Sequence, residues 1–442
     1  MKLKNITKYN PLFVILIFSL TIRLVYALVS YQNTGIDRFD DDWDYVSYAK
    51  AILDQGIWLT DISKIPGDAS IITPGFPLIL ASIFYVFGEK YSAVFIVNSI
   101  ISTITVFAIY GLGKIIFNFR VGLLSSAWAS LYILFIYYIP TCLKEIWLLF
   151  FITISVYFIT IDINVNKLTW RTGVSAFVFS LLIHIDERFF VFFPLFIGLF
   201  LITENGTLMK KFQKAMFFAM VVLLLMIPWL IRNYNVYKRI IILSERTSIF
   251  TDELFGYEKN SQLLSYMGVT YDLDLFQSYS DSIGAGFSVN NVPSGLNHET
   301  LIKGISLGYI PHKFSKAERR WADFKEYWRP VRFSGGYINH GFRFQGPSWS
   351  WYGNLTRGLT YGILLPFFLV GICLIIKNNN RLGLFLLSLI LVHMFIHIEF
   401  YHVVNRYRIQ IDPLIILISF YAIDYLLIKF IPNFYKPKIY FN

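Results

Sequence analysis

Charged residues and cysteines are both scarce in this sequence. Asp, Glu, Lys and Arg together make up 15% of the 442 residues, whereas about a quarter of the residues of a soluble domain are charged. Hydrophobic residues make up 56%, which excludes an ordinary soluble enzyme. The two cysteines, Cys142 and Cys373, are too few for a disulfide framework, and their spacing fits no zinc site.

What the sequence has in place of charge is a series of long apolar stretches. Each is about 20 residues long, enough to cross the hydrocarbon core of a bilayer. We therefore predict an all-α polytopic membrane protein with about ten transmembrane helices, outer juxtamembrane helices and one long mixed outer loop. The predicted spans are 11–31, 92–117, 120–139, 143–162, 170–185, 188–203, 212–232, 357–376, 382–398 and 409–430.

Two apolar segments need a separate interpretation. The first span follows a lysine-containing N-terminus, as in a signal peptide, but no small-residue cleavage site follows it. It is interpreted as a retained first helix. The segment 76–88 is too short for an ordinary span, so it is interpreted as a helix that lies in the membrane interface or dips into it from outside.

The net charge of +11 is explained by membrane topology rather than by nucleic acid. With the ten predicted spans, every short basic loop falls on the same side of the membrane. By the positive-inside rule this side is the cytoplasm. The N- and C-termini are then predicted to be cytoplasmic. The basic residues in question are Lys2, Lys4, Lys8, Lys114, Arg120, Lys167, Arg171, Lys210, Lys211, Lys214, Lys377, Arg381, Lys429, Lys436 and Lys438.

The spans divide the chain into three predicted parts. Residues 1–232 form an N-terminal membrane module whose first outer loop, 32–75, holds a dense acidic run. Residues 233–356 form a long outer loop, and residues 357–442 hold the last transmembrane helices. Within the long loop, Ser315-x-x-Glu318 predicts a helix start by its capping-box spacing. This helix would carry an aromatic stripe of Trp321, Phe324 and Trp328.

The acidic run Asp40-Asp41-Asp42-Trp43-Asp44-Tyr45 comes shortly after the first span. From Asp40 to about Leu53 the apolar residues recur at helical spacing, which predicts an amphipathic helix near the membrane surface. One of the carboxylates could simply cap this helix. A cap needs only one, so a catalytic role or a divalent cation site for Mg²⁺ or Mn²⁺ stays open.

The order of several motifs resembles the GT-C membrane glycosyltransferases, most closely the bacterial protein-mannosyltransferase-like and aminoarabinose-transferase-like group. The resemblance covers roughly residues 10–245 and 400–430. It is carried by the following motifs, in chain order: Asp41-Asp42-Trp43-Asp44-Tyr45, then Pro74-Gly75-Phe76-Pro77-Leu78 leading to Gly88, Pro228-Trp229-Leu230-Ile231-Arg232-Asn233-Tyr234, and Arg406-Tyr407-Arg408 with Pro413.

The resemblance implies inverting transfer of a sugar from a polyprenyl-phosphate-linked donor, at the outer face of a bacterial inner or plasma membrane. The acceptor would be a lipid, a glycan or a protein, and no nucleic acid is involved. By motif position Asp41 would be the catalytic base and Asp42 the flanking acid, while Tyr45 would bind substrate. Glu145 matches the place of a second acid. Aminoarabinose-type relatives have a phosphate-binding lysine where this chain has Thr73-Pro74, so its phosphate contacts must come from elsewhere.

Four arginines at the outer ends of predicted spans could supply those contacts. Sugar transfer develops negative charge on the leaving phosphate, which a guanidinium can neutralise with two hydrogen bonds. The alternative is that these side chains only reach for the interface between membrane and water. The four predicted substrate-binding arginines are Arg188, Arg232, Arg406 and Arg408.

Other roles remain open on the sequence alone. His184, Asp186 and Glu187 share a tight outer turn with Arg188, so some of them could simply pair with it. His393 and His397 could share a helix face and bind a metal, but no third ligand is near them in the sequence. An oligosaccharyltransferase or polysaccharide ligase would use a similar donor. A transporter or flippase of lipid or solute is the alternative from another class. Transporters place ionisable groups near the middle of the bilayer, whereas this chain has few mid-span charges, Arg23 being one of them.

Overall fold

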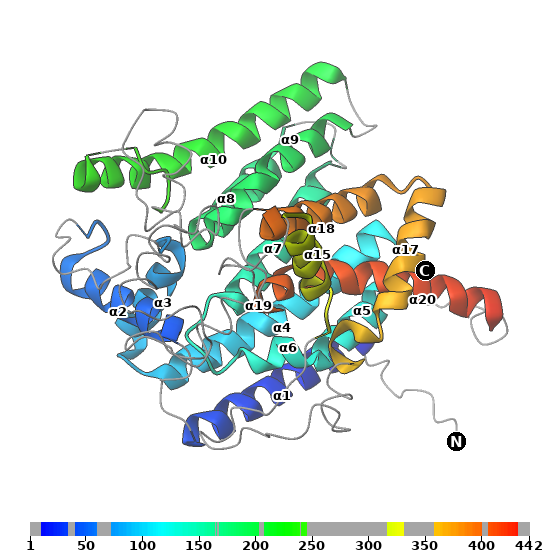
Figure 1. Cartoon of the computed structure of the whole chain (residues 1–442), viewed down its shortest axis with the longest axis horizontal. Coiled ribbons are helices and arrows are strands. Elements are labelled where there is room, and N and C mark those ends of the chain that lie inside the picture. The colour runs from blue at the N-terminus through cyan, green and yellow to red at the C-terminus, as the bar shows by residue number, and fades with distance from the viewer. Residues whose placement is uncertain are drawn as a thin grey trace, which may run out of the picture.

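The computed structural model is a bundle of long helices with shorter helices packed among them and at the left of the view (Figure 1). Among the residues it describes there is no strand, so the predicted all-α membrane fold is confirmed. For Asp40, Asp41 and Arg406 the backbone is described but the side chain is not. The described residues are 10–33, 40–59, 72–163, 165, 168–202, 207–238, 240–244, 316–330, 358–399 and 405–431.

The helices follow the apolar pattern of the sequence. The first group comprises α1 (Pro11–Asn33), α2 (Asp40–Gln55), α3 (Gly75–Phe87), α4 (Tyr91–Ile116), α5 (Phe119–Leu131), α6 (Ile133–Tyr137), α7 (Glu145–Ile163), α8 (Trp170–Ile185), η3 (Glu187–Phe192), α9 (Phe193–Ile202) and α10 (Leu208–Tyr237). The second comprises α15 (Lys316–Tyr327), η4 (Gly358–Gly362), α17 (Leu365–Lys377), α18 (Arg381–Glu399), α19 (Asn405–Arg408), η5 (Ile409–Ile411) and α20 (Asp412–Phe430).

Each predicted span contains helix in its described part, but the helices differ in length. Within the described residues, seven helices are long and apolar enough to cross a membrane. The predicted span 120–139 is divided into α5 and α6, and the span 188–203 begins with a turn of 3₁₀ helix before α9. The helix α8 has 16 residues, and α3 has 13 residues, as expected for a helix that does not span.

A single charged side chain holds the break between α5 and α6 in place. Tyr132 adopts an extended conformation there, which leaves the last carbonyls of α5 without helical partners. Arg23 of α1 is fully buried. It donates to the carbonyls of Ala129 at 3.1 Å and Ser130 at 2.8 Å, and to the Ser102 hydroxyl of α4 at 2.9 Å. This mid-membrane charge therefore ties three helices together.

The helices α4 and α5 cross closely because both carry glycine at the crossing. A Cβ atom on Gly113 would lie 2.6 Å from the Cα atom of Gly122, a distance that real Cβ atoms do not reach. Small residues let transmembrane helices approach until their backbones touch. The glycines of the 111–113 segment thus belong to helix packing, in agreement with their position at the end of a membrane helix.

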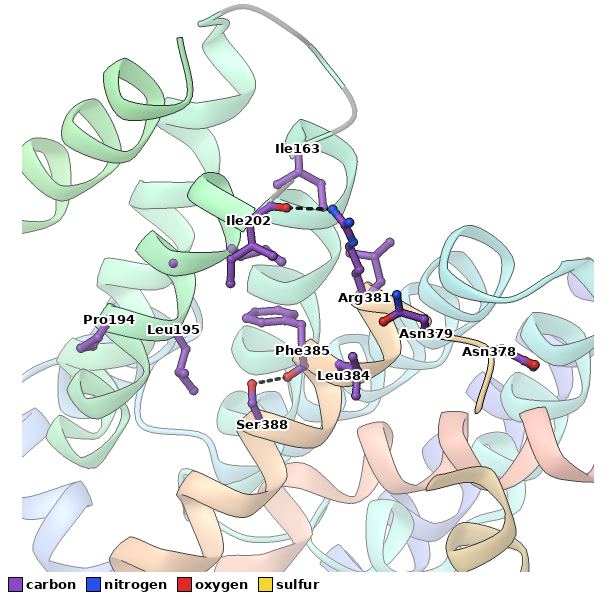
Figure 2. Close-up of a pocket in the computed structure, with 13 residues that line it drawn as sticks. Ile163, Pro194, Leu195, Ile202, Asn378, Asn379, Arg381, Leu384, Phe385 and Ser388 are labelled. Carbon is purple, nitrogen blue, oxygen red and sulfur yellow. Dashed lines mark hydrogen bonds between the residues drawn. The ribbon is translucent and has the colours of Figure 1, made fainter. Parts of the chain in front are cut away.

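One end of the bundle, which we call the basic end, gathers the helix ends that carry the basic residues. Arg120 pairs with Asp424 of α20 at 2.8 Å, and Lys214 of α10 pairs with Asp162 of α7 at 3.2 Å. Arg381 at the start of α18 donates to the carbonyl of Ile202 at the end of α9, at 3.1 Å (Figure 2). These contacts place the predicted cytoplasmic loops at one end of the bundle.

The opposite end, which we call the α2 end, carries the short helices α2 and α3. In Figure 1, α2 and α3 lie at the left, on the side away from the end of α20. The predicted amphipathic helix is α2, which begins at Asp40 and ends at Gln55. The predicted helix of the long outer loop is α15. Its capping-box residues Ser315 and Glu318 lie outside the described positions and side chains.

Candidate active site

The helix α2 turns its motif residues toward the protein. Asp42 and Tyr45 are buried, whereas Trp43 is 60% exposed. The ring of Tyr45 meets the ring of Phe76 edge-on, with 5.0 Å between centroids, and this contact packs α2 on α3. Burying a carboxylate is costly unless polar groups or charges compensate it. The position of Asp42 at 1% exposure therefore marks this face of α2 as a polar interior rather than a solvated surface.

Arg232, at the end of α10, holds the chain that leaves α2. Its Nε atom donates to the Trp58 carbonyl at 2.8 Å, and one Nη atom donates to the Leu59 carbonyl at 2.7 Å. The other Nη atom donates to Asn233 at 2.9 Å. The guanidinium also lies over the Trp229 ring, 4.8 Å from its centroid. Arg232 thus has a positioning role for α2, and substrate binding by this residue stays a prediction.

A buried cluster of charges lies between the start of α7 and the end of α8. The ammonium of Lys144 is 2.9 Å from the Asp186 carboxylate. Arg188 donates to the same carboxylate from Nε at 2.8 Å and from one Nη atom, so Asp186 is a residue of this turn that pairs with Arg188. All three side chains are buried. We call them the Lys144–Asp186–Arg188 triad. With two cations and one anion, its own charge is +1.

The pKa values of the triad follow from its geometry. Burial by itself would raise the pKa of Asp186, but Arg188 and Lys144 hold it well below its usual range. Burial likewise opposes the charge on Lys144, yet the neighbouring Asp186 carboxylate raises the pKa of this ammonium above its ordinary value. Both directions favour the charged forms of Asp186 and Lys144, and the buried Glu187 carboxyl is a further neighbour of the Lys144 ammonium.

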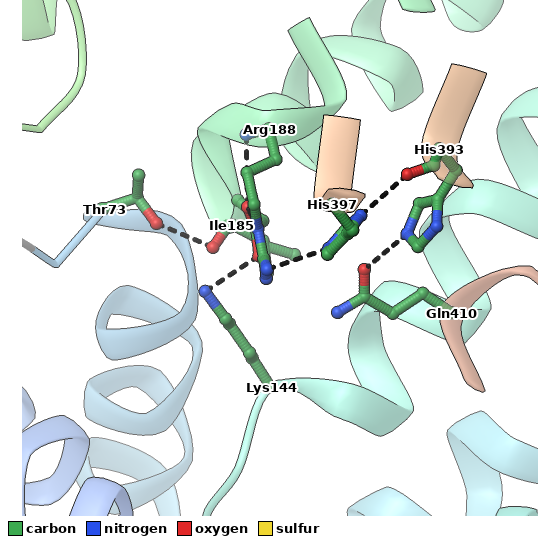
Figure 3. Close-up of polar contacts among 8 residues, drawn as sticks. Thr73, Lys144, Ile185, Arg188, His393, His397 and Gln410 are labelled. Atoms are coloured by element: carbon green, nitrogen blue, oxygen red, sulfur yellow. Dashed lines mark hydrogen bonds and ion pairs between the residues drawn. The ribbon is translucent and has the colours of Figure 1, made fainter. Parts of the chain in front are cut away.

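The motif tyrosine Tyr45 lies next to the triad. The Lys144 ammonium is 5.9 Å from the centroid of its ring, and Glu145, the predicted second acid, is the next residue and is also buried. Thr73, just before α3, donates its hydroxyl to the Ile185 carbonyl at 2.6 Å (Figure 3). The structure therefore brings α2, the entry to α3, the start of α7 and the end of α8 to one place.

Arg188 extends the site toward the last helices. Its guanidinium lies over the Tyr407 ring at 4.2 Å from the centroid, and one Nη atom is 3.1 Å from His397 Nε2 (Figure 3). The other ring nitrogen of His397, Nδ1, is 2.8 Å from the His393 carbonyl, which can only accept a hydrogen bond. His397 Nδ1 therefore carries the proton, and Nε2 accepts from Arg188.

His393 connects this layer to the helix α15. Its Nδ1 atom is 2.8 Å from the hydroxyl of Tyr327, and its Nε2 atom is 3.3 Å from Gln410. The rings of His393 and His397 stack with 4.2 Å between centroids. This confirms that the two histidines share a helix face, but both use their nitrogens within the polar network.

Arg408 is buried beside this network and stabilises it. It pairs with Asp412 at 3.2 Å, lies 3.5 Å from the centroid of the Tyr361 ring, and donates to the carbonyls of Tyr327 and Arg329. Asp412 in turn accepts from the hydroxyl of Tyr132 at 2.6 Å. Arg408 thus ties α15 to the start of α20.

The predicted site residues fall into three groups. Tyr45, Glu145 and Arg188 come together around Lys144 and Asp186, and Asp42 is buried on the same helix as Tyr45. Arg232 and Arg408 fasten neighbouring segments, as described above. The side chains of Asp41 and Arg406 are outside the described part, so their roles stay predictions. Sequence reasoning missed Lys144, although a lysine at the start of an apolar run is a signal that could have drawn attention.

Potential metal ligands do not gather within the described part of the chain. Among the described side chains, no three His, Cys, Asp or Glu residues converge on a point that could hold a metal ion. His393 and His397 accordingly lack a third ligand there. The side chains of Asp40 and Asp41 are not among those described, so the hypothesis of a divalent cation on the acidic run stays open.

Comparisons with known proteins show which proteins the chain resembles. A family model for dolichyl-phosphate-mannose-protein mannosyltransferase matches residues 72–231. The archaeal oligosaccharyltransferase AglB from Archaeoglobus fulgidus, in complex with an inhibitory peptide and a dolichol-phosphate, is similar in structure. Its TM-score is 0.51 at 12% identity, covering 93% of this chain and 50% of that chain. The apo form of the oligosaccharyltransferase from the same organism gives a TM-score of 0.52 at 12% identity, covering 93% of this chain and 51% of that chain. The chain has the GT-C fold.

The resemblance to the GT-C superfamily is thus confirmed for the fold. The chain spans about half the length of the oligosaccharyltransferases it matches. ArnT from Cupriavidus metallidurans in the apo state has a TM-score of 0.42 at 10% identity, covering 92% of this chain and 76% of that chain. None of the curated protein sequences compared with the chain matches it.

Proposed function

We propose that this protein is an inverting membrane glycosyltransferase. It moves a sugar from a polyprenyl-phosphate-linked donor to a lipid, glycan or protein acceptor. The proposal is supported by the GT-C fold, by the match to a mannosyltransferase family model over residues 72–231, and by a neighbour that holds a dolichol-phosphate. The observation that carries it is the buried Lys144–Asp186–Arg188 triad beside the motif face of α2.

The triad suits the phosphate of such a donor. Within the described residues, the Lys144 ammonium donates to the Asp186 carboxylate. An ammonium carries three N–H donors. The remaining donors can meet phosphate oxygens, and the positive charge of the triad stabilises the negative charge that develops as phosphate departs. Thr73 is bonded to Ile185, next to Asp186. Lys144 therefore supplies, from another part of the chain, the ammonium that lysine-containing relatives have before the short apolar helix.

The transfer then follows from two proposed roles. Asp41 accepts the proton of the acceptor hydroxyl, whose oxygen attacks the anomeric carbon from the side opposite the phosphate. The new carbon–oxygen bond forms as the bond to the phosphate oxygen breaks, so the configuration inverts, and the phosphate leaves with the electron pair. Asp42, Glu145 and Tyr45 position the substrates.

The four predicted arginines have different proposed roles in this reaction. Arg188 holds phosphate together with Lys144. Arg232 and Arg408 act through the segments that they fasten, namely the chain after α2 and the helix α15. Arg406 is proposed as a further phosphate contact because it lies one residue before Tyr407, which stacks on Arg188.

The reaction is proposed to take place on the extracytoplasmic face of a bacterial inner or plasma membrane. The basic end of the bundle would face the cytoplasm by the positive-inside rule, together with both termini. The α2 end would then lie outside, where the donor phosphate is reached from the outer leaflet.

Sugar transfer by the purified full chain in detergent tests the proposal. Polyprenyl-phosphate sugars serve as donors, and wild type is compared with Asp41→Asn and with Asp54→Asn, an exposed acid of the same helix. Loss of transfer in folded Asp41→Asn, with activity kept in Asp54→Asn, is expected. Full activity of Asp41→Asn would overturn the base assignment. Inhibition by EDTA, reversed by Mg²⁺ or Mn²⁺, would move the acidic run to a cation site.

The second candidate function is transfer of a whole glycan, as in an oligosaccharyltransferase or polysaccharide ligase. It is favoured by the fold likeness to the archaeal oligosaccharyltransferase over 93% of this chain. Donors that carry one sugar or an oligosaccharide distinguish the two functions. Transport of lipid or solute gains little support, because the mid-membrane Arg23 is fully engaged by hydroxyl and carbonyl groups of neighbouring helices.

A further inference from the structure

A cavity opens between α9 and α18 at the basic end of the bundle (Figure 2). Its volume is about 720 Å³, within the range of about 300–1,000 Å³ that is typical of sites for small ligands. It lies far from the candidate active site. Sixteen positions of α18 separate Arg381 at the cavity from His397 in the polar network, which corresponds to about 24 Å along a helix axis.

The cavity exists because α9 is short and carries a glycine where it faces α18. The helix α9 has 10 residues. A Cβ atom built on Gly198 would have nothing within 4 Å, so the side of α9 that carries Gly198 faces open space. Beside the cavity, the ring of Phe385 of α18 meets the ring of Phe196 of α9 edge-on, with 5.5 Å between centroids. The helices therefore touch through Phe196 and Phe385 and again where Arg381 meets the Ile202 carbonyl, and the cavity lies between these contacts, along Gly198.

The lining of the cavity is amphiphilic. Its walls are largely apolar and include Leu195, Leu199 and Phe385, whereas Arg381 and Asn379 line it at one end. Figure 2 shows Arg381 and Asn379 on the side of Ile202, away from Leu195 and Ser388. The hydrogen bond from Arg381 to the Ile202 carbonyl holds the guanidinium at that end.

The position of the cavity decides what chemistry can fill it. The walls belong to helices that cross or enter the membrane, and the polar end lies where the spanning helices α17 and α18 meet in a short turn. In this position the apolar walls face hydrocarbon, and the cation lies at the depth of the lipid headgroups. Basic pockets between transmembrane helices on the cytoplasmic side suit the head groups of anionic lipids.

We propose that this cavity binds an anionic phospholipid. One acyl chain lies between α9 and α18 across Gly198, and the phosphodiester head group is bound by Arg381 and the side-chain amide of Asn379. The site is additional to the donor site and does not depend on the proposed glycosyl transfer. Bound lipid joins the end of α9 to the start of α18, so it stabilises the folded bundle.

Thermal unfolding of the full chain in detergent tests this site. Dioleoyl phosphatidylglycerol is added and compared with dioleoyl phosphatidylcholine, which has the same acyl chains. We expect phosphatidylglycerol to raise the Tm of wild type more than phosphatidylcholine does. Arg381→Gln should weaken the apparent Kd for phosphatidylglycerol about tenfold, because a charge-assisted hydrogen bond is lost. Lys377→Gln removes an exposed charge of the same turn that does not line the cavity, and should leave binding unchanged.

A second pair of variants tests the place of the acyl chain. Gly198→Phe fills the cavity from a position where a side chain meets nothing, so it should fold and lose the phosphatidylglycerol effect. Gly198→Ala should keep it. Native mass spectrometry counts the retained lipid in each variant. Equal effects of the two lipids, or phosphatidylglycerol binding that survives Gly198→Phe, would overturn the proposal. Selective stabilisation by polyprenyl phosphate, lost in Gly198→Phe, would assign the cavity to the donor tail instead.

Discussion

The ammonium of Lys144 and the carboxylate of Asp186 form a buried ion pair, with 2.9 Å between Nζ and Oδ2. This pair joins the residue before α7 to the residue after α8. Arg188 forms a second ion pair with the same Asp186 carboxylate. A buried carboxylate with two cationic partners is charged and firmly oriented. The pair therefore joins α7 to α8 and is also part of the proposed phosphate-binding site.

Replacement of Lys144 by methionine should separate these two roles. Asp186 keeps Arg188 as a partner, so we expect a loss of stability of about 1–3 kcal/mol. The value of kcat/KM for a polyprenyl-phosphate sugar should fall about 100-fold, because a donor to the leaving phosphate is missing. Steady-state kinetics and a Tm measurement check this. Lys50→Met, which breaks the partly exposed pair with Glu89, serves as the control and should cost at most about 1 kcal/mol. Unchanged kcat/KM in folded Lys144→Met would remove Lys144 from the site.

The stability contributed by Asp186 should depend on pH in a defined direction. The pKa of this carboxyl is lower in the folded protein than its ordinary value. Its contribution is therefore fully present above an unfolded pKa of about 3.9 and is lost as pH falls toward the folded pKa. Unfolding of wild type and Asp186→Asn should differ by a constant amount from about pH 5 to 8 and converge below about pH 4. A difference that grows on acidification would contradict the charged state of Asp186.

Removal of the Arg23 guanidinium should damage the fold and leave the chemistry intact. Arg23→Met removes hydrogen bonds to Ser19, Ser102, Ala129 and Ser130, and the carbonyls at the end of α5 then lose their partner. We expect the Tm to fall by an amount equivalent to about 2–4 kcal/mol. Transfer per folded molecule should stay near wild type. Lys114→Met, an exposed cation of α4, is the control. A folded Arg23→Met that loses all activity would indicate a direct role in a pathway through the membrane.

The hydroxyl of Tyr327 should control how firmly α15 is held on α18. Tyr327→Phe removes the hydrogen bond to His393 and leaves a buried ring nitrogen without it, at a cost of about 1–3 kcal/mol. Backbone amides of α15 should then exchange with deuterium faster, as measured by mass spectrometry. Trp321 of the same helix is 59% exposed, so Trp321→Phe should not change the deuterium exchange of α15. Equal protection in wild type and Tyr327→Phe would mean that the other contacts of α15, among them the Arg320–Glu399 ion pair and the bonds from Arg408, are sufficient to hold it.

Hydropathy and periodicity were sufficient for the membrane fold. Apolar stretches of about 20 residues can satisfy their backbone in a bilayer only as helices, and the predicted spans are helices in the structure. The amphipathic pattern after Asp40 likewise predicted α2, because side chains on one face of a helix are set by local spacing. The breaks inside the spans 120–139 and 188–203 were not predicted. An extended residue such as Tyr132 is stabilised by Arg23, which lies on another helix.

The sequence by itself thus determined the class of the protein, the helical character of its apolar stretches and the position of α2, since these depend on hydropathy and on contacts a few residues apart. Only the tertiary structure decided that Lys144 meets Asp186 and that Arg188 meets His397. It also decided that Arg232 holds the chain after α2 and that Gly198 faces a cavity. These relationships join residues far apart in the chain. They depend on how closely helices pack, and no local spacing encodes that distance.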